Sequence, residues 1–337
     1  MTWQDKALRL WLDNTSWKVI VDLLTSEYPG AHLNRDRIRD YIRCTQEYKD
    51  KQKQKYIDKK EPKDTDIDEY IQAMYELQEK QERLDTKQVK ATFRVPENKP
   101  VAIALWGDWH VGASGVDYKR LDKDTDTIGN TEGLYWVGMG DYKDNYQSFG
   151  HIGAQYEQVI QPGMQDRAVL HRLKDVSENN IALIRGCHDD WDYKTTNKDF
   201  ISTMCAVTGA FNLWHGGDLT IEAGTQKYHF KLRHKYKFES SLNVENSMRR
   251  IMEIQGACDV AGAAHLHNPY YIERHLMGEF RVMCRTGSYK IWDEFGQKLA
   301  GYKGKPGIPT IILYPDKHRM IPLFLDDAVT VLRGLRL

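Results

Sequence analysis

The chain of 337 residues lacks an apolar run near the roughly 20 residues that a membrane-spanning helix requires. Its first residues, Met1-Thr2-Trp3-Gln4-Asp5, lack the apolar stretch of a secretory signal peptide. Its five cysteines are an odd number at no disulfide-framework spacing. It also lacks an excess of either charge, with 48 basic and 48 acidic residues. These absences exclude binding to membrane or nucleic acid driven by global charge, and we expect a cytoplasmic protein under reducing conditions.

The composition is that of a globular protein, with 41% hydrophobic and 28% charged residues. The length is enough for one large domain and a smaller one. Strand-like and helical runs alternate only after about Thr92. We therefore expect three parts: a helical unit over 1–48, a charged linker with an amphipathic helix over 49–92, and an α/β domain over 93–337.

The sequence of the first part predicts two helices joined by a short turn. Ser16 is placed to cap a helix through Glu27, and the sequence Tyr28-Pro29-Gly30 ends it. Asn34 is placed to cap a second helix over 35–44, whose outward face carries Arg35, Arg37, Arg39 and Arg43. This outline is that of a helix-turn-helix-like unit that binds DNA. The alternative is a small helical cap with a solvated charged face.

The second part is strongly polar. Residues 35–60 contain ten basic and five acidic residues, a local charge of +5 that suits phosphate contacts but is also typical of a solvated linker helix. Residues 66–85 then carry apolar side chains at near-heptad spacing. This spacing predicts an amphipathic helix that docks on the larger domain or pairs with a second copy in a homodimer.

The third part repeats one pattern: an apolar run followed by candidate metal ligands. The run Val101-Ala102-Ile103-Ala104-Leu105 is followed by Asp108 and His110. In an extended chain, residues two apart point to the same side, so we expect both side chains at one spot. Further apolar runs end at 139, 184, 232 and 264, each before polar residues. Strand ends in an open α/β sheet form a common crevice, which predicts a shared metal site.

Five blocks carry a resemblance to the calcineurin-like metallophosphoesterases. They are Asp108-Trp109-His110, Gly140-Asp141-Tyr142-Lys143-Asp144, Gly186-Cys187-His188-Asp189, His234, and His265-Leu266-His267. The resemblance covers roughly residues 100–290. It implies an α/β fold in four layers, with two mixed sheets packed face to face and helices outside. The chain is also similar to phage-encoded phosphoesterases with an N-terminal unit, which implies the host cytoplasm.

The resemblance implies two divalent metal ions as cofactors. Asp108, His110 and His267 would hold one ion, His234 and His265 the other, and Asp141 would bridge them. A water between the ions would attack phosphorus in line with the leaving oxygen.

The same resemblance assigns catalytic roles beside the metals. His188 would stabilise the transition state or protonate the leaving group. Asp144 and Asp189 would orient the metal ligands or His188. For the lone histidine we choose His234, because it follows a strand-like run; His215 and His229 are the alternatives.

Two positions depart from the family pattern. Cys187 replaces an asparagine that gives an amide oxygen to the second metal. A thiolate there would favour zinc or iron, or manganese, over magnesium, whereas a neutral thiol would leave a weaker second site. Ala264 replaces the glycine before His265, and its methyl group is expected to shift that loop.

The sequence thus predicts a metal-dependent phosphoesterase that cleaves phosphodiesters, with DNA as the first candidate substrate. The helical unit and the +5 segment favour DNA, and the zero net charge opposes it. One alternative is a phosphomonoesterase or a small-molecule or cyclic-nucleotide phosphodiesterase. Another is a non-catalytic DNA-binding or scaffold protein.

Overall fold

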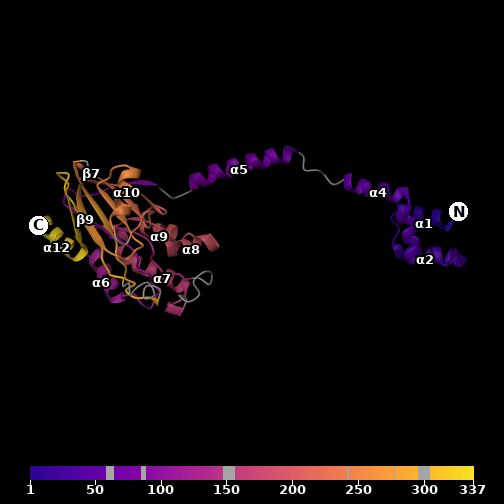
Figure 1. The fold of residues 1–337 in the computed structure, drawn as a ribbon, viewed down its shortest axis with the longest axis horizontal. Coiled ribbons are helices and arrows are strands. Elements are labelled where there is room, and N and C mark those ends of the chain that lie inside the picture. Colours follow the sequence, from indigo (N-terminus) through magenta and orange to yellow (C-terminus); the bar gives the residue numbers. More distant parts are fainter. Residues whose placement is uncertain (58–63, 85–88, 147–155, 241–242, 277, 295–303) are drawn as a thin grey trace. The chain divides into compact units, whose positions relative to one another are not determined.

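The computed structural model describes residues 1–57, 64–84, 89–146, 156–240, 243–276, 278–294 and 304–337. The chain divides into two compact units, Met1–Asp85 and Thr86–Leu337. Figure 1 traces both along the sequence. Parts of several predicted segments lie outside the described residues: 58–60 of the charged run, 85 of the amphipathic helix, and 155 and 241–242 of helices expected over 155–177 and 239–256.

The first unit is a small helical core. Its helices are α1 (Trp3–Leu12), α2 (Trp17–Glu27), the 3₁₀ turn η1 (Pro29–Ala31), α3 (Arg35–Cys44) and α4 (Gln46–Ile57). One buried residue of α1 and two each from α2 and α3 meet in the centre with Leu33: Ala7, Ile20, Leu24, Ile38 and Ile42. Their spacing of three to four residues places them on one face of each helix, so burial fixes how α1, α2 and α3 pack.

Two predicted helix starts are present, with different caps. Asn34 Oδ1 accepts a hydrogen bond from Arg37 N at 2.9 Å. Ser16 precedes α2 but makes no side-chain cap hydrogen bond. Residues 28–34 connect α2 to α3, a longer link than the three- to four-residue turn of a helix-turn-helix.

The amphipathic segment forms α5 (Asp64–Leu84), a 21-residue helix. Its large apolar side chains are exposed, among them Ile67, Tyr70, Met74 and Leu77. Within the residues described, no helix has the length and apolar character needed to cross a membrane.

The second unit contains two mixed six-stranded sheets, as the resemblance implies. The first has the order β12-β11-β2-β3-β4-β5, where β2, β3, β4 and β5 run parallel and β11 runs antiparallel to both of its neighbours, β2 and β12. The bounds are β2 Val101–Trp106, β3 Leu134–Gly138, β4 Asn180–Leu183, β5 Phe211–Asn212, β11 Pro309–Leu313 and β12 Met320–Phe324.

The second sheet has the order β1-β6-β7-β8-β10-β9. Within it, β7, β8 and β10 run parallel to one another. The bounds are β1 Lys90–Arg94, β6 Gly216–Ala223, β7 Gln226–Arg233, β8 Val260–Ala263, β9 Tyr270–Leu276 and β10 Glu279–Arg285.

Strand β2 shows why the sheets stack. Its side chains alternate between two cores: Val101, Ile103 and Leu105 face the other sheet, whereas Ala102, Ala104 and Trp106 face the helices. Both faces are buried, which is why β2 reads as a continuous apolar run.

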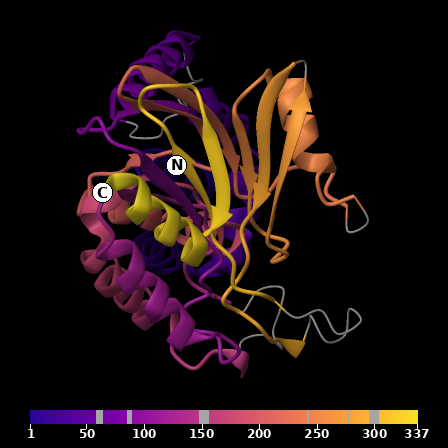
Figure 2. The same cartoon turned by 90° about the vertical axis from the view of Figure 1, so that its left-hand side faces the viewer.

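Helices complete the four layers. Helix α10 covers the outer face of the second sheet, and α6, α7, α9 and α12 pack on the outer face of the first (Figure 2). The remaining helices are α6 Tyr118–Gly129, α7 Pro162–Leu173, η3 Lys174–Asn179, α8 Cys187–Thr196, α9 Phe200–Thr208, α10 Asn246–Gln255 and α12 Leu325–Arg336. The predicted α/β fold class is therefore confirmed.

Candidate metal centre

The predicted ligands lie where parallel strands end. In the first sheet, β2, β3 and β4 lead to Asp108, Asp141 and Cys187, and in the second sheet β7 and β8 lead to His234 and His265. Because parallel neighbours end at one edge of a sheet, their following loops converge. The ligand atoms form overlapping groups within 4.8 Å of one another, and we call these seven residues the metal centre: Asp108, His110, Asp141, Cys187, His234, His265 and His267.

The expectation that Asp108 and His110 lie in extended chain is wrong. Strand β2 ends at Trp106, and the φ angles of Asp108 and His110 are 51° and 49°. Three further members have positive φ: Asp141 at 53°, His265 at 72° and His267 at 55°. This left-handed conformation costs about 1–3 kcal/mol for a non-glycine residue and persists only where surrounding contacts impose it. Backbone strain is therefore concentrated at the metal centre.

The first ligand group contains Asp108, His110 and His267. The Nε2 atoms of His110 and His267 are 3.1 Å apart, and Asp108 Oδ1 is 3.5 Å from His267 Nε2. The other carboxylate oxygen, Oδ2, accepts hydrogen bonds from Thr286 Oγ1 at 2.9 Å and His265 N at 3.2 Å. One oxygen of Asp108 is thus held by the protein while the other faces the histidines.

Asp141 and His234 lie beside this group. Asp141 Oδ2 is 3.2 Å from His234 Nε2, and Asp141 Oδ1 accepts a hydrogen bond from His188 N at 2.8 Å. His234 Nδ1 donates to the Met139 carbonyl at 2.8 Å, which fixes the ring and leaves Nε2 directed at Asp141. A carboxylate within reach of Asp108 and His234 has the position that a bridging ligand requires.

Cys187 and His265 complete the second ligand group with His234. Cys187 Sγ lies 3.7 Å from His265 Nδ1. Ala264, the second departure from the family pattern, is fully buried in the core between the sheets, and its N donates to the His234 carbonyl at 3.0 Å. Its methyl group is accommodated there, and His265 and His267 still reach Asp108.

The donor set fits divalent metal ions. Asp108 Oδ1 and His234 Nε2 are buried and have no hydrogen-bond partner in the described part of the chain. A buried polar atom without a partner carries a desolvation cost of about 1–3 kcal/mol, which coordination would remove. Aspartate, histidine and cysteine donors suit zinc, iron or manganese better than magnesium, which prefers oxygen ligands.

Burial sets the protonation of two histidines in a form that binds metal. Burial lowers the pKa of His110 to about 4, and the pKa of His265 is also lowered to about 4 by burial and by the nearby His234. A neutral imidazole is the ligand form of histidine. Burial alone would raise the pKa of Asp141, but the neighbouring His234 and His188 lower it well below its usual range.

His188 stands at the edge of the metal centre. Its Nδ1 donates to the Asp144 carbonyl, so its Nε2 is left for other contacts. Its ring lies 4.6 Å from the His110 ring and 4.2 Å from the Trp191 ring, measured between centroids. The side chain is partly exposed, as a group that contacts a substrate must be.

Asp144 and Asp189 support the ligands in different ways. Asp144 Oδ1 lies 3.3 Å from His110 Nδ1. Asp189 Oδ2 accepts hydrogen bonds from Asp141 N at 2.8 Å and Gly186 N at 2.9 Å, which ties two loops together. Asp144 also forms a group with His110 and His188, whose ligand atoms lie within 4.8 Å of one another.

The sequence analysis missed a buried group after β10. Lys290 Nζ donates to Asp144 Oδ1 at 3.0 Å and lies 3.2 Å from Asp293 Oδ2. Thr286 bonds Asp108 Oδ2, and Ser288 Oγ donates to the Asp108 carbonyl at 3.0 Å. Strand β10 is parallel to β8, so the carboxyl end of β10 lies at the same edge of the second sheet as that of β8. The signal was present, since Thr286, Ser288 and Lys290 follow shortly after the apolar run Val282-Met283-Cys284.

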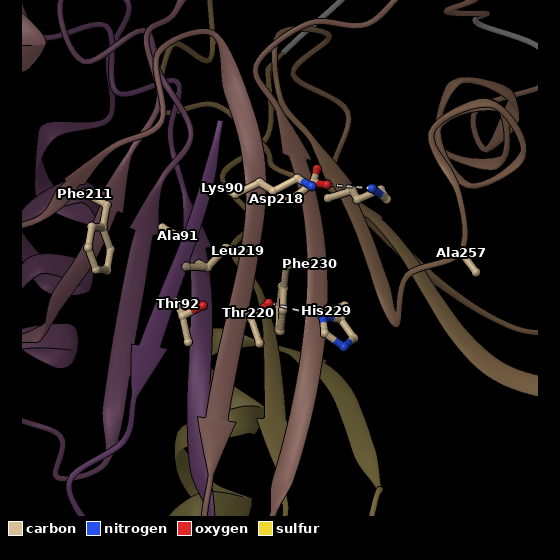
Figure 3. A pocket seen from close by; sticks show the side chains of 11 residues that line it. Lys90, Ala91, Thr92, Phe211, Asp218, Leu219, Thr220, His229, Phe230 and Ala257 are labelled. Atoms are coloured by element: carbon tan, nitrogen blue, oxygen red, sulfur yellow. Dashed lines mark hydrogen bonds and ion pairs between the residues drawn. The ribbon is translucent and has the colours of Figure 1, made fainter. Parts of the chain in front are cut away.

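The two alternatives to His234 lie elsewhere. His215 is half exposed and 3.9 Å from Asp190. His229 points into a separate pocket of about 430 Å³ on the second sheet, where its Nδ1 is 3.2 Å from Thr220 Oγ1 (Figure 3). Asp218 and Lys231 pair across the same pocket.

No protein-family model matches the chain, and no curated protein matches it. Among solved structures, the chain is similar to Vps29 of Chaetomium thermophilum, with 12% identity, a TM-score of 0.37, and coverage of 66% of this chain and 95% of that one. The protein TM1076 of Thermotoga maritima has 13% identity, a TM-score of 0.33, and coverage of 66% and 99%. The sulfate thiohydrolase SoxB of Thermus thermophilus, in complex with glycerol, has 9% identity, a TM-score of 0.36, and coverage of 73% and 61%. The chain's own two-sheet fold agrees with the fold that the resemblance implies, and candidate ligands from the five motifs lie close together.

Proposed function

We propose that the chain is a metal-dependent phosphoesterase that hydrolyses phosphodiester bonds, with DNA as the substrate. The observation that carries the proposal is the pair of ligand groups that share the neighbourhood of Asp141: Asp108, His110 and His267 on one side, and Cys187, His234 and His265 on the other. This is a donor set for two divalent ions rather than one.

Each group would hold one ion, and Asp141 would contact both. When bound, two such ions lower the pKa of a water molecule, which then acts as a nucleophile, and neutralise charge on the phosphate. The role of the chain is to keep the ligands in place. Thr286 and Met139 do so for Asp108 and His234, through hydrogen bonds to the atoms that do not face the centre.

His188 is the proposed acid of the reaction. Its Nδ1 is engaged by the Asp144 carbonyl, which leaves Nε2 to protonate the leaving oxygen or to bond a phosphate oxygen. Trp191 packs on the ring and limits its rotation. Asp144, in turn, is held by Lys290, so the buried lysine supports the position of both His110 and His188.

DNA is proposed as substrate because of the first unit. Helix α3 presents Arg35, Arg37 and Arg43 at the surface. The local excess of positive charge over 35–60 suits a polyanion, although the chain as a whole is neutral.

The test is hydrolysis of four substrates: bis-p-nitrophenyl phosphate, p-nitrophenyl phosphate, and labelled single- and double-stranded DNA. Each is assayed with Mn²⁺, Zn²⁺ and Mg²⁺, with His188→Ala as the control variant. We expect cleavage of DNA and of the chromogenic diester. In the variant, we expect the rate of cleavage to fall by about 10²–10⁴-fold, the usual contribution of a general acid. Turnover of small esters alone would replace DNA by a small-molecule substrate. Inactivity on all four, with metal bound, would leave a binding or scaffold protein.

A further inference from the structure

The first unit contains a cavity of about 620 Å³. Its size lies within the range of small-molecule and cofactor sites. Its lining includes aromatic, cationic and small polar side chains and no carboxylate: Trp11, Asn14, Thr15, Ser16, Trp17, Arg39, Arg43, Tyr48, Lys51 and Gln52. A concave surface with three cations and no acid attracts an anion, and its aromatic surface suits a planar ring.

The amino end of α2 opens into this cavity through Ser16 and Trp17. The Ser16 side chain makes no capping hydrogen bond, and the first turn of α2 contains no acidic residue. The first backbone N–H groups of a helix have no partner within the helix, and the dipole places positive charge there. This end therefore offers donors for a phosphate, as helix starts commonly do.

The cations are arranged in two ways. Lys51 is fixed to the wall: its Nζ donates to the Leu12 carbonyl at 3.1 Å and to Asn14 Oδ1 at 2.9 Å, and it lies 4.7 Å from the centroid of the Trp11 ring. Arg39 and Arg43 lie one turn apart on α3, so both guanidinium groups are on one face of that helix. Arg43 is exposed.

The aromatic wall is preorganised. Trp11 contacts Tyr48, with 5.1 Å between ring centroids and 38° between ring planes. Both side chains also pack against the core of the unit, which limits their motion. Trp17 stands beside them at the start of α2. Stacking of a base on such a side chain contributes about 1–3 kcal/mol.

We infer that this cavity binds a nucleoside phosphate unit, either as a free nucleotide or as part of a single strand of nucleic acid. The phosphate contacts Arg39, Arg43 and the amino end of α2, and the base packs on the tryptophan side chains. The inference goes beyond the proposed hydrolysis, because the cavity lies in the unit Met1–Asp85 and contains no residue of the metal centre.

The experiment measures binding by the full chain in excess EDTA, so that cleavage does not interfere. The probe is a fluorescein-labelled single-stranded oligonucleotide, followed by anisotropy, with the same oligonucleotide unlabelled, dAMP, inorganic tripolyphosphate and duplex DNA as competitors. The test variant is Arg39→Gln/Arg43→Gln. The matched control is Arg9→Gln/Lys80→Gln, which removes the same charge from exposed positions of α1 and α5 outside the cavity and outside residues 35–60.

We expect the test variant to weaken binding at least about tenfold, because it loses the charge-assisted hydrogen bonds of two guanidinium groups to the phosphate. The control is expected to change it less than about twofold. Competition by dAMP assigns the cavity to free nucleotides, and competition by single strands alone assigns it to nucleic acid. The inference is overturned if both variants weaken binding equally. It is also overturned if tripolyphosphate or duplex DNA competes as well as the single strand does, or if the chain binds neither the labelled oligonucleotide nor dAMP.

Binding in EDTA also separates this inference from the proposed function. A chain that binds the oligonucleotide but hydrolyses nothing would keep the cavity and lose the nuclease. A chain that hydrolyses chromogenic diesters but binds no nucleotide in the cavity would keep the phosphoesterase and lose the inference.

Discussion

At the scale of single residues, Cys187 has the strongest effect on the expected chemistry of the metal centre. Its Sγ lies 3.7 Å from His265 Nδ1 and within one ligand group with His234. A sulfur in this group selects softer ions, because thiolate binds zinc or iron more strongly than magnesium. Because the other two members of this group are histidines, we propose that the choice of metal at this position depends on Cys187.

Replacing Cys187 by asparagine tests this dependence. The change is expected to lower Zn²⁺ affinity at the second ligand group by at least about tenfold, since even residues that only support metal ligands contribute about 10–100-fold. Metal content after dialysis and the thiolate-to-metal absorption of the Co²⁺-loaded protein provide the measurement. Cys205→Ala is the control, because Cys205 is also partly buried but lies on α9 and packs against the core. Unchanged zinc content and an unchanged Co²⁺ spectrum in Cys187→Asn would contradict ligation.

The predicted site residues meet in space for a reason that the sequence did not reveal. Asp108 and His110 were expected together because extended chain alternates, yet both are left-handed and follow the strand. No local signal predicts positive φ at an aspartate or histidine, because the conformation is imposed by contacts that are distant in sequence. One such contact is Thr286 Oγ1 to Asp108, across 178 positions.

At the scale of elements, β2 and β7 were predictable from the positions of their apolar residues, and β6 was not. β2 and β11 are buried on both faces and read as apolar runs. β6 alternates buried and half-buried positions in the sequence GGDLTIEA, where its two glycines and its acids hide the pattern. α8 was missed as a helix because its first residues had already been assigned to a ligand block, and its apolar content is low.

Helix α5 carries an unpaired apolar seam. Ile67, Tyr70, Met74 and Leu77 follow the a and d positions of a heptad, continued by Gln81 and Leu84. The side chains of Met74 and Leu77 are 59% and 60% exposed. A helix with such a seam gains stability when it pairs, because knobs of one copy fill holes of the other. We propose a second copy of α5 as its partner.

Two glutamates in the seam are expected to abolish this pairing. Met74→Glu/Leu77→Glu would place like charges opposite one another in the dimer, and should shift the chain to a monomer in light scattering coupled to size exclusion. Gln72→Glu/Tyr75→Glu, which adds the same charge at positions f and b, should remain dimeric. A wild-type chain that is monomeric across micromolar concentrations, or a seam variant that still dimerises, would rule out this use of α5.

At the scale of the whole molecule, the division at residues 85 and 86 separates two cores. The first contains Ile38 and Ile42 of α3, and the second contains the layers between and beside the sheets. The metal centre draws its ligands from both sheets of the second core alone. Coordination would therefore join the two sheets of one unit at a shared edge, and its free energy would stabilise that unit.

Metal binding is consequently expected to stabilise one of two thermal transitions. A ligand at 100 times its dissociation constant adds about 2.7 kcal/mol to the unit that binds it. In calorimetry, Zn²⁺ or Mn²⁺ should raise the midpoint temperature of one transition relative to EDTA and leave that of the other unchanged. Ile38→Ala, which removes a fully buried side chain of α3, should lower only the metal-insensitive transition, by about 2–5 kcal/mol in unfolding free energy. If Ile38→Ala lowers the metal-responsive transition as well, or if one transition covers the whole chain, the two units unfold together and the division does not extend to stability.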